Sequence, residues 1–196
     1  MTQASGQPVS ERDLKPYLDL EGRHADLFNT GAIQRVDVSR TRDLGPVEEV
    51  DMDEFRIVNF SRTGTMLATG GVSGCVAVCA RGTTSAGEEM LGLWHHSGLE
   101  DSNVVLQTLQ SGLEHHGVAR DDVSMYLVGG SIVPEEDEGG SIETESELLA
   151  LRDRYNIHGA ALHLSVGEYD QSGQPNEVGV VLHPRNIMYS PGLIVD

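Results

Sequence analysis

Short apolar runs, four to seven residues long and separated by glycine-, serine- and threonine-rich segments, recur along residues 55–182. Runs of this length are typical of β-strands, because helices usually need ten residues or more. Residues 75–80 are apolar at every position, which predicts a strand buried on both faces. The pattern predicts a sheet-based fold whose strands lie at residues 55–60, 66–69, 75–80, 90–95, 123–128, 160–166 and 177–182.

Two stretches have the features of amphipathic helices. The first begins near Asp101 and ends before Gly117, and its apolar residues recur at helical spacing, namely Val105, Leu109 and Leu113. The second follows the Thr-Glu-Ser-Glu sequence of residues 144–147, which fits a capping box. We therefore expect an α/β fold in which a central, mainly antiparallel and sandwich-like β-sheet is flanked by two main helices.

Residues 1–50 differ from the rest of the chain, since they hold six of its thirteen basic residues and few apolar clusters. We predict that they form a partly disordered or loosely packed N-terminal extension, and that residues 51–196 form the folded domain. The acidic residues within 48–54 are expected to be a solvated face or linker. Residues 134–147 carry seven acids and no base, which predicts an exposed loop.

The charge of the chain excludes several classes of partner. Acidic residues outnumber basic ones 31 to 13, for a formal net charge of −18, which argues against binding to nucleic acid or to an anionic membrane surface. Apolar runs fall short of a membrane span, so we expect no membrane insertion. The start of the chain shows no secretory signal pattern. We expect a cytoplasmic protein or, alternatively, one secreted as an effector without a Sec signal peptide.

The strongest local motif is Thr-Gly-Gly-Val-Ser-Gly-Cys at residues 69–75. Three glycines within five residues allow a turn whose backbone N–H groups, near Ser73 and Gly74, can converge on an oxyanion. Cys75 at its end is placed as a nucleophile, and the next strand brings two histidines back beside it if the two strands form a hairpin. The alternative is that Cys75 is a small buried hydrophobe.

The sequence Gly-Val-Ser-Gly-Cys-Val-Ala-Val-Cys at residues 71–79 resembles the glycine-rich, cysteine-bearing signature of the CheD chemoreceptor glutamine deamidases. It is also similar to the Ser-Gly-Cys motif of the cytotoxic-necrotizing-factor toxins, which share that catalytic core. The order of predicted elements matches CheD over roughly residues 55–190. The resemblance implies a CheD-like fold for residues 51–196.

The resemblance also implies a catalytic cysteine, histidine and threonine. Cys75 matches the nucleophile, and Thr69, six positions earlier, matches the threonine. The His-Ser-Gly sequence that begins at His96 resembles the toxins' His-Thr-Gly, whereas the Trp-His pair that ends at His95 resembles a lethal-factor toxin. Neighbouring strand residues face opposite ways, so only one ring can serve. The motif favours His96, and His95 stays open.

The activity implied is deamidation of glutamine side chains on a protein substrate with an accessible glutamine, in a chemotaxis or toxin-like setting. It requires neither a cofactor nor a metal, and adjacent histidine pairs such as His95-His96 do not face one ion. Two alternatives remain at this point. The chain can be a noncatalytic CheD-like protein-binding module, or it can use the same thiol as a transglutaminase or small-amide hydrolase.

Overall fold

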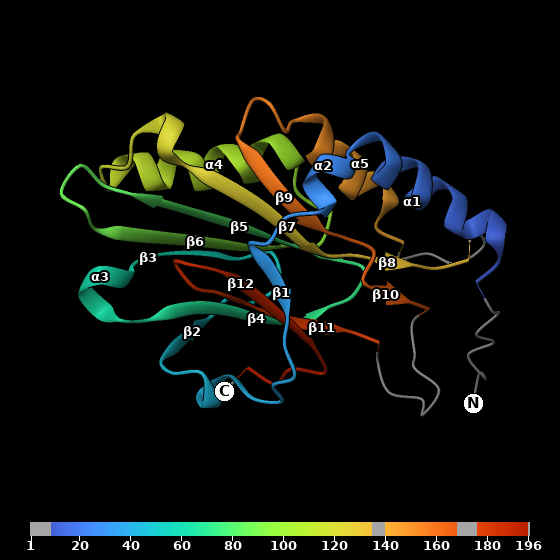
Figure 1. The fold of residues 1–196 in the computed structure, drawn as a ribbon, viewed down its shortest axis with the longest axis horizontal. Coiled ribbons are helices and arrows are strands. Elements are labelled where there is room, and N and C mark those ends of the chain that lie inside the picture. The colour runs from blue at the N-terminus through green and yellow to red at the C-terminus, as the bar shows by residue number, and fades with distance from the viewer. Residues whose placement is uncertain (1–8, 135–139, 168–175, 196) are drawn as a thin grey trace.

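Two five-stranded sheets stack on each other in the computed structural model, which describes residues 9–134, 140–167 and 176–195 (Figure 1). Helices cover the outer face of one sheet, so the layers run helix, sheet, sheet. The expected α/β class with a sandwich-like arrangement of sheet is confirmed. Within the described ranges, no helix combines the length and apolar character needed to cross a membrane.

The helix-covered sheet contains five of the predicted strands, although the one predicted at residues 160–166 overlaps its strand only at 160–161; the strands predicted at 66–69 and 177–182 lie in the second sheet. The first four strands of the helix-covered sheet are antiparallel neighbours, and its last strand runs parallel to the fourth. In order across the sheet these strands are β3 (Phe55–Asn59), β6 (Glu89–His96), β5 (Val76–Thr83), β7 (Ser124–Gly129) and β9 (Ile157–Ala161). The central strand β5 is buried on both faces along residues 76–80, as its continuous apolar run predicts.

The second sheet has an antiparallel centre with a parallel strand added at each edge. Its strands are, in order, β1 (Ile33–Arg35), β12 (Ile187–Pro191), β11 (Val178–Leu182), β4 (Met66–Val72) and β2 (Val47–Glu49). A separate parallel pair joins β8 (Ser131–Ile132) to β10 (Ser165–Val166). The strands β1, β2 and β12 were not predicted; β1 and β2 have three residues each, too few to show a period of their own.

The two predicted helices are present, with one boundary moved. They are α4 (Ser102–His115) and α5 (Ile142–Ala150), and the other helical segments are α1 (Glu11–Arg23), α2 (Ala25–Phe28), α3 (Phe60–Thr63), η1 (Thr41–Asp43) and η2 (Arg120–Asp122). The predicted capping box at residues 144–147 is wrong, because α5 already begins two residues before Thr144 and Ser141 precedes it. The predicted acidic loop is likewise helical from Ile142, and its residues 135–139 lie outside the described part.

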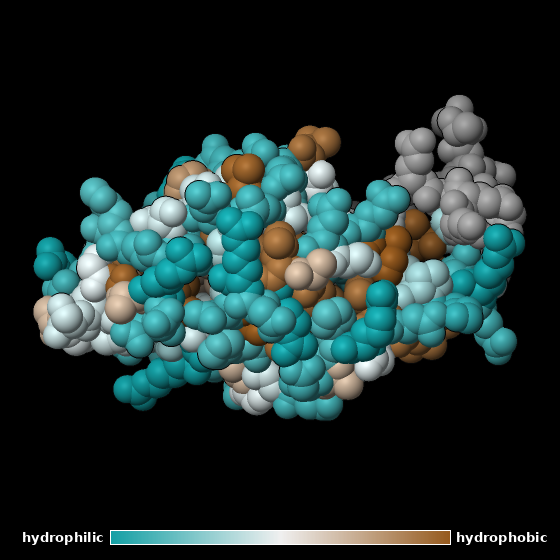
Figure 2. Space-filling view, turned by 90° about the horizontal axis from the view of Figure 1, so that it is seen from above, coloured by the Kyte–Doolittle hydropathy of each residue, from teal (hydrophilic) through white to brown (hydrophobic). Residues whose placement is uncertain are grey.

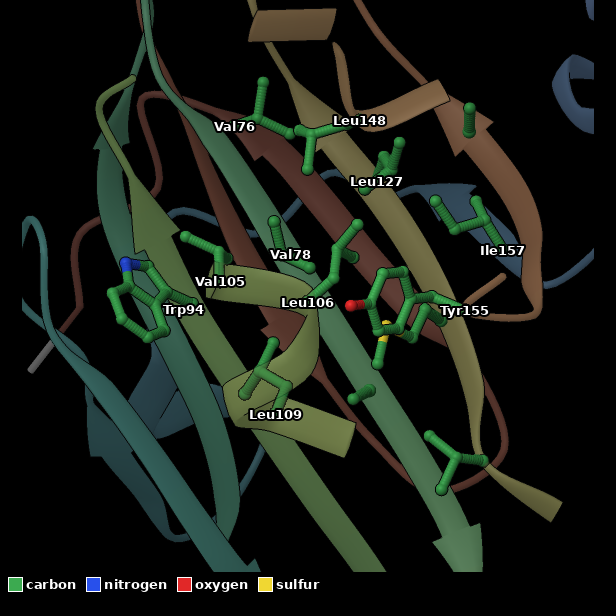
Figure 3. Packing of buried hydrophobic residues seen from close by; sticks show 14 of the residues in the cluster. Val76, Val78, Trp94, Val105, Leu106, Leu109, Leu127, Leu148, Tyr155 and Ile157 are labelled. Carbon is green, nitrogen blue, oxygen red and sulfur yellow. The ribbon is translucent and has the colours of Figure 1, made fainter. Parts of the chain in front are cut away.

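Two large apolar layers fill the molecule, and a smaller buried cluster around Ala68 and Val181 lies on the outer face of the second sheet. One layer lies between the helices and the first sheet, where side chains of α4, α5 and the strands β5, β6, β7 and β9 meet (Figure 3). The other lies between the two sheets and includes side chains of β4, β5, β6 and β11. Seen from the helix side, the surface is mostly hydrophilic with separated apolar spots (Figure 2). The sheet β3-β6-β5-β7-β9 is therefore covered on both faces.

The prediction of a loosely packed N-terminal extension is wrong for residues 9–50. A capping box between Ser10 and Asp13 starts α1, and Tyr17, Leu20 and Leu27 are buried. Leu20 and Leu27 belong to the apolar layer under the helices, while β1 and β2 complete the second sheet. The apolar residues here are few but fall on one helix face, and residues 1–8 lie outside the described part.

Candidate active site

A β-bulge places the glycine-rich motif at the end of β4. Thr69 lies opposite Val180 of β11, but Val72 lies opposite Val178, so β4 has one residue more than its partner. Gly71 absorbs the extra residue with a φ of +66°, a conformation that favours glycine. Residues 73–75 then bend into β5, which differs from the turn predicted over residues 70–74.

Cys75 lies in this bend, on the face of β5 that points between the two sheets. Side chains alternate along the strand, so Val76 packs under the helices while Ala77 packs between the sheets, on the same side as Cys75. The thiol is half-buried. Burial raises the pKa of Cys75 to about 11, and the negative charge of Asp53 acts in the same direction. The thiol is therefore protonated near neutral pH and needs a base to become a nucleophile.

His95 lies on the same face of the sheet as Cys75. It pairs with Ala77 across the β5–β6 ladder, and its side chain reaches β4, where Nδ1 lies 2.7 Å from Oγ1 of Thr69. The Thr69 hydroxyl donates its one proton to the carbonyl oxygen of Val50 at 2.7 Å. It must therefore accept the second hydrogen bond, which makes His95 the donor at Nδ1.

This pairing leaves Nε2 of His95 as the nitrogen with a lone pair. Nε2 is buried and has no hydrogen-bond partner among the described residues. Burial lowers the pKa of the imidazole, although Asp53 and Asp51 act in the opposite direction. The ring is therefore neutral at neutral pH and able to accept a proton at Nε2.

His96 points to the other face of the sheet, as strand alternation predicts. It pairs with Val76 and lies toward α4, with Nε2 3.4 Å from Oγ of Ser102, which donates to Glu147 at 3.0 Å. The structure therefore brings Thr69 together with His95 and places His96 elsewhere. The motif that favours His96 does not encode the ladder register, and the register decides which ring faces the second sheet.

Asp53 is a candidate that the sequence reasoning assigned only to a solvated acidic run. Its backbone N–H donates to the carbonyl oxygen of His95 at 2.7 Å, and its carboxylate accepts from N and Oγ of Ser97 at 3.1 and 2.7 Å. Its φ is +58°, in the left-handed region, which aspartate and asparagine adopt more often than most other residues except glycine. Asp53 thus holds the end of β6 and places a negative charge near both Cys75 and His95.

A glycine pair fixes the backbone of Cys75 from β7. The N–H of Gly130 donates to the carbonyl oxygen of Cys75 at 2.8 Å. Gly129 and Gly130 have φ values of +127° and +78°, and a Cβ on Gly130 would collide with the side chain of Glu145. Only glycine fits this turn, so the site depends on it.

The predicted oxyanion residues Ser73 and Gly74 lie in the bend itself, next to the thiol, and both are half-buried. Among the residues that the structure describes, no group of three or more His, Cys, Asp or Glu side chains could hold a metal ion. The arrangement provides a thiol, a neutral imidazole and a hydroxyl that orients it, which are the groups used in nucleophilic amide chemistry.

Comparison with known proteins gives little beyond this geometry. No family model and no curated protein matches the chain. One similar solved structure is that of Neisseria meningitidis protein NMB0706, from the family DUF152, with a TM-score of 0.41 and 13% sequence identity. The match covers 63% of this chain and 65% of that chain, less than two thirds of its length. A likeness this low says nothing about the site.

Proposed function

We propose that this chain is a cysteine-dependent amidohydrolase that deamidates glutamine side chains of a protein substrate. Cys75 would be the nucleophile, His95 the general base and acid, and Thr69 a positioning residue for the imidazole. The observation that carries the proposal is the 2.7 Å hydrogen bond from His95 to Thr69. It leaves the lone pair of Nε2 on the sheet face that also carries the thiol. The resemblance of residues 71–79 to the CheD and toxin signatures supports the same chemistry.

The reaction follows from these roles. Nε2 of His95 takes the thiol proton, and the sulfur of Cys75 attacks the carbonyl carbon of the glutamine side chain. Backbone N–H groups of the bend at residues 73–75 stabilise the developing oxyanion. The imidazolium gives its proton to the nitrogen of the tetrahedral intermediate, which collapses to a thioester as ammonia leaves. Water, deprotonated by His95, then hydrolyses the thioester to glutamate and restores the thiol.

The resting state is a neutral pair rather than a thiolate–imidazolium pair. Burial raises the pKa of Cys75 to about 11 and lowers the pKa of His95, so each group is neutral near pH 7. Proton transfer would therefore accompany the attack, with the base positioned before the substrate binds. The nearby charge of Asp53 favours the imidazolium that forms in this step.

The test compares the two cysteines of the chain. Casein serves as a glutamine-rich probe, with ammonia release and the mass change from amide to acid as readouts. Cys75→Ala should abolish both signals, whereas the matched control Cys79→Ala should retain them, since Cys79 lies deep between the sheets. Thermal melting confirms that both variants fold. Ammonia release by a folded Cys75→Ala protein would refute the proposal, and an amine adduct in place of glutamate would indicate transglutamination.

A further inference from the structure

Two strongly exposed apolar side chains belong to the chain segments that adjoin the candidate site. Among the described residues, seven large hydrophobic side chains are exposed, and four of them belong to residues 52–55 and 99–104. Met52 and Leu99 are the most exposed of these four, at 62% and 87%. Such a concentration on a protein that otherwise buries its apolar residues is typical of an interaction surface.

Met52 and Leu99 flank the contact that holds the end of β6. Met52 forms a parallel bridge with His95, and the N–H of Leu99 donates to Oγ of Ser97 at 3.3 Å. Ser97 is in turn bound by Asp53, whose charge reaches the thiol of Cys75. We call Met52 and Leu99 the apolar rim.

The chain segments that carry the apolar rim are acidic. Residues 44–55 and 95–104, which hold Met52 and Leu99, contain no Lys or Arg. Arg56 is the next basic residue, and its charge is already paired with Glu48 at 3.5 Å and Glu54 at 2.7 Å. Asp51 and Asp53 act on His95 of the site, whereas Glu100 and Asp101 act on His96, on the other face of the sheet.

A second observation indicates that a ligand completes this site. His95 is 4% exposed, yet its Nε2 has no partner among the described residues. Nδ1 of the ring contacts Thr69, so Nε2 lies on the side of the ring that faces away from Thr69. A buried polar atom left unpaired costs free energy, and such atoms in native proteins usually have a functional reason.

We propose that the substrate is a polypeptide segment whose reactive glutamine has an apolar side chain and Lys or Arg residues close to it. This inference rests on the proposed function. The apolar side chain packs on the apolar rim, the basic residues meet the acidic segments that carry it, and the glutamine amide reaches Cys75 and His95. The charges serve mainly to steer and select the segment, because exposed ion pairs contribute little affinity each.

The experiment measures binding without turnover, in the Cys75→Ala protein. The probes are three fluorescent peptides: one with a glutamine, a leucine and two arginines, one with that leucine replaced by serine, and one with both arginines replaced by glutamate. The first peptide should bind at least about tenfold more tightly than either of the others. Its advantage over the glutamate peptide should shrink as salt is added.

Substitutions on the protein locate the surface. Leu99→Ser and Met52→Ser should each weaken binding of the first peptide about tenfold. Leu18→Ser is the matched control, because Leu18 is 60% exposed on α1, and it should bind as the parent does. All three side chains are exposed, so the variants should fold, and melting curves verify this.

Each outcome has one meaning. Equal binding of the three peptides, or unchanged binding by Leu99→Ser, overturns the assignment of this surface. The assignment is also overturned if Leu99→Ser and Met52→Ser change the oligomeric state in sedimentation but not peptide binding, because the apolar rim would then join two copies of the chain. If the first peptide binds selectively but the protein with Cys75 intact does not deamidate it, the binding surface is supported and the proposed deamidase activity is refuted.

Discussion

A single hydroxyl links the two sheets at the candidate site. Thr69 of β4 donates to Val50 and accepts from His95 of β6, so it sets both the position and the tautomer of the imidazole. Thr69→Val should therefore lower kcat roughly 100-fold with little change in KM, because only the base is misplaced. Thr69→Ser, which keeps the hydroxyl, should recover most of the rate. Equal losses in both variants would contradict the orienting role.

The charge of Asp53 gives the pH dependence a definite sign. The base must be neutral, so kcat/KM for a small glutamine amide should rise with pH through the pKa of His95, which burial lowers below 6.5. Asp53 raises that pKa, and Asp53→Asn removes its charge while asparagine still fits the positive φ. The midpoint of the acidic limb should then move to lower pH.

The control for Asp53→Asn is Asp121→Asn, in the short helical segment η2, which removes an equal charge. Its profile should match that of the parent. A midpoint that stays in place in Asp53→Asn, or moves equally in both variants, would show that Asp53 has no specific effect on His95.

The part of the site that can be predicted from the sequence is the part whose residues are close together along the chain. The spacing from Thr69 to Cys75 crosses one bend, so a motif can encode it. The choice between His95 and His96 depends on pairing with β5 and on which face the second sheet covers, and neither is a local property. Asp53 was missed because its role comes from a positive φ and a contact with Ser97, 44 residues away.

At the scale of elements, α1 provides the clearest test of how the N-terminal residues contribute. Leu20 on its inner face is 1% exposed, and Leu18 on its outer face is 60% exposed. Leu20→Ala should lower the free energy of unfolding by about 2–5 kcal/mol through loss of burial and a residual cavity. Leu18→Ala should stay within about 0.5 kcal/mol of the parent. Equal effects in urea denaturation would mean that α1 does not pack as described.

Elements with their own periodicity were predicted well, and elements defined by distant partners were not. Leu109 and its neighbours identify α4 because they repeat on one face, and Gly117, with a φ of +91°, follows its end. The start of α5 was misplaced because Ser141 uses its hydroxyl to donate to Glu145 at 2.6 Å rather than to cap the helix in the usual way. The edge strands β1 and β2 exist only through parallel pairing with β12 and β4.

At the scale of the whole molecule, the site lies where the layers meet. His95 belongs to the sheet that is covered on both faces, Cys75 lies in the bend that leads into its strand β5, and Thr69 belongs to the second sheet. The site therefore needs the two sheets to pack in a fixed relative position. Any change that shifts one sheet against the other should displace the imidazole of His95 before it changes the helices. This makes activity a more sensitive measure of sheet packing than helix content.

The net charge of −18 makes the molecule repel itself, with 31 acidic side chains against 13 basic ones. Exposed ion pairs such as Lys15–Asp19 lose strength in salt, but acidic residues exceed basic ones by 18, so screening of their mutual repulsion should stabilise the fold overall. Raising NaCl from about 0.01 to about 0.15 M shortens the Debye length from about 30 to about 8 Å. We expect a gain of roughly 1 kcal/mol, or about 2–4 °C in Tm for a chain of this size. KCl should act equally, because screening depends on ionic strength; a response to one cation alone, or a fall in Tm, would contradict self-repulsion as the cause.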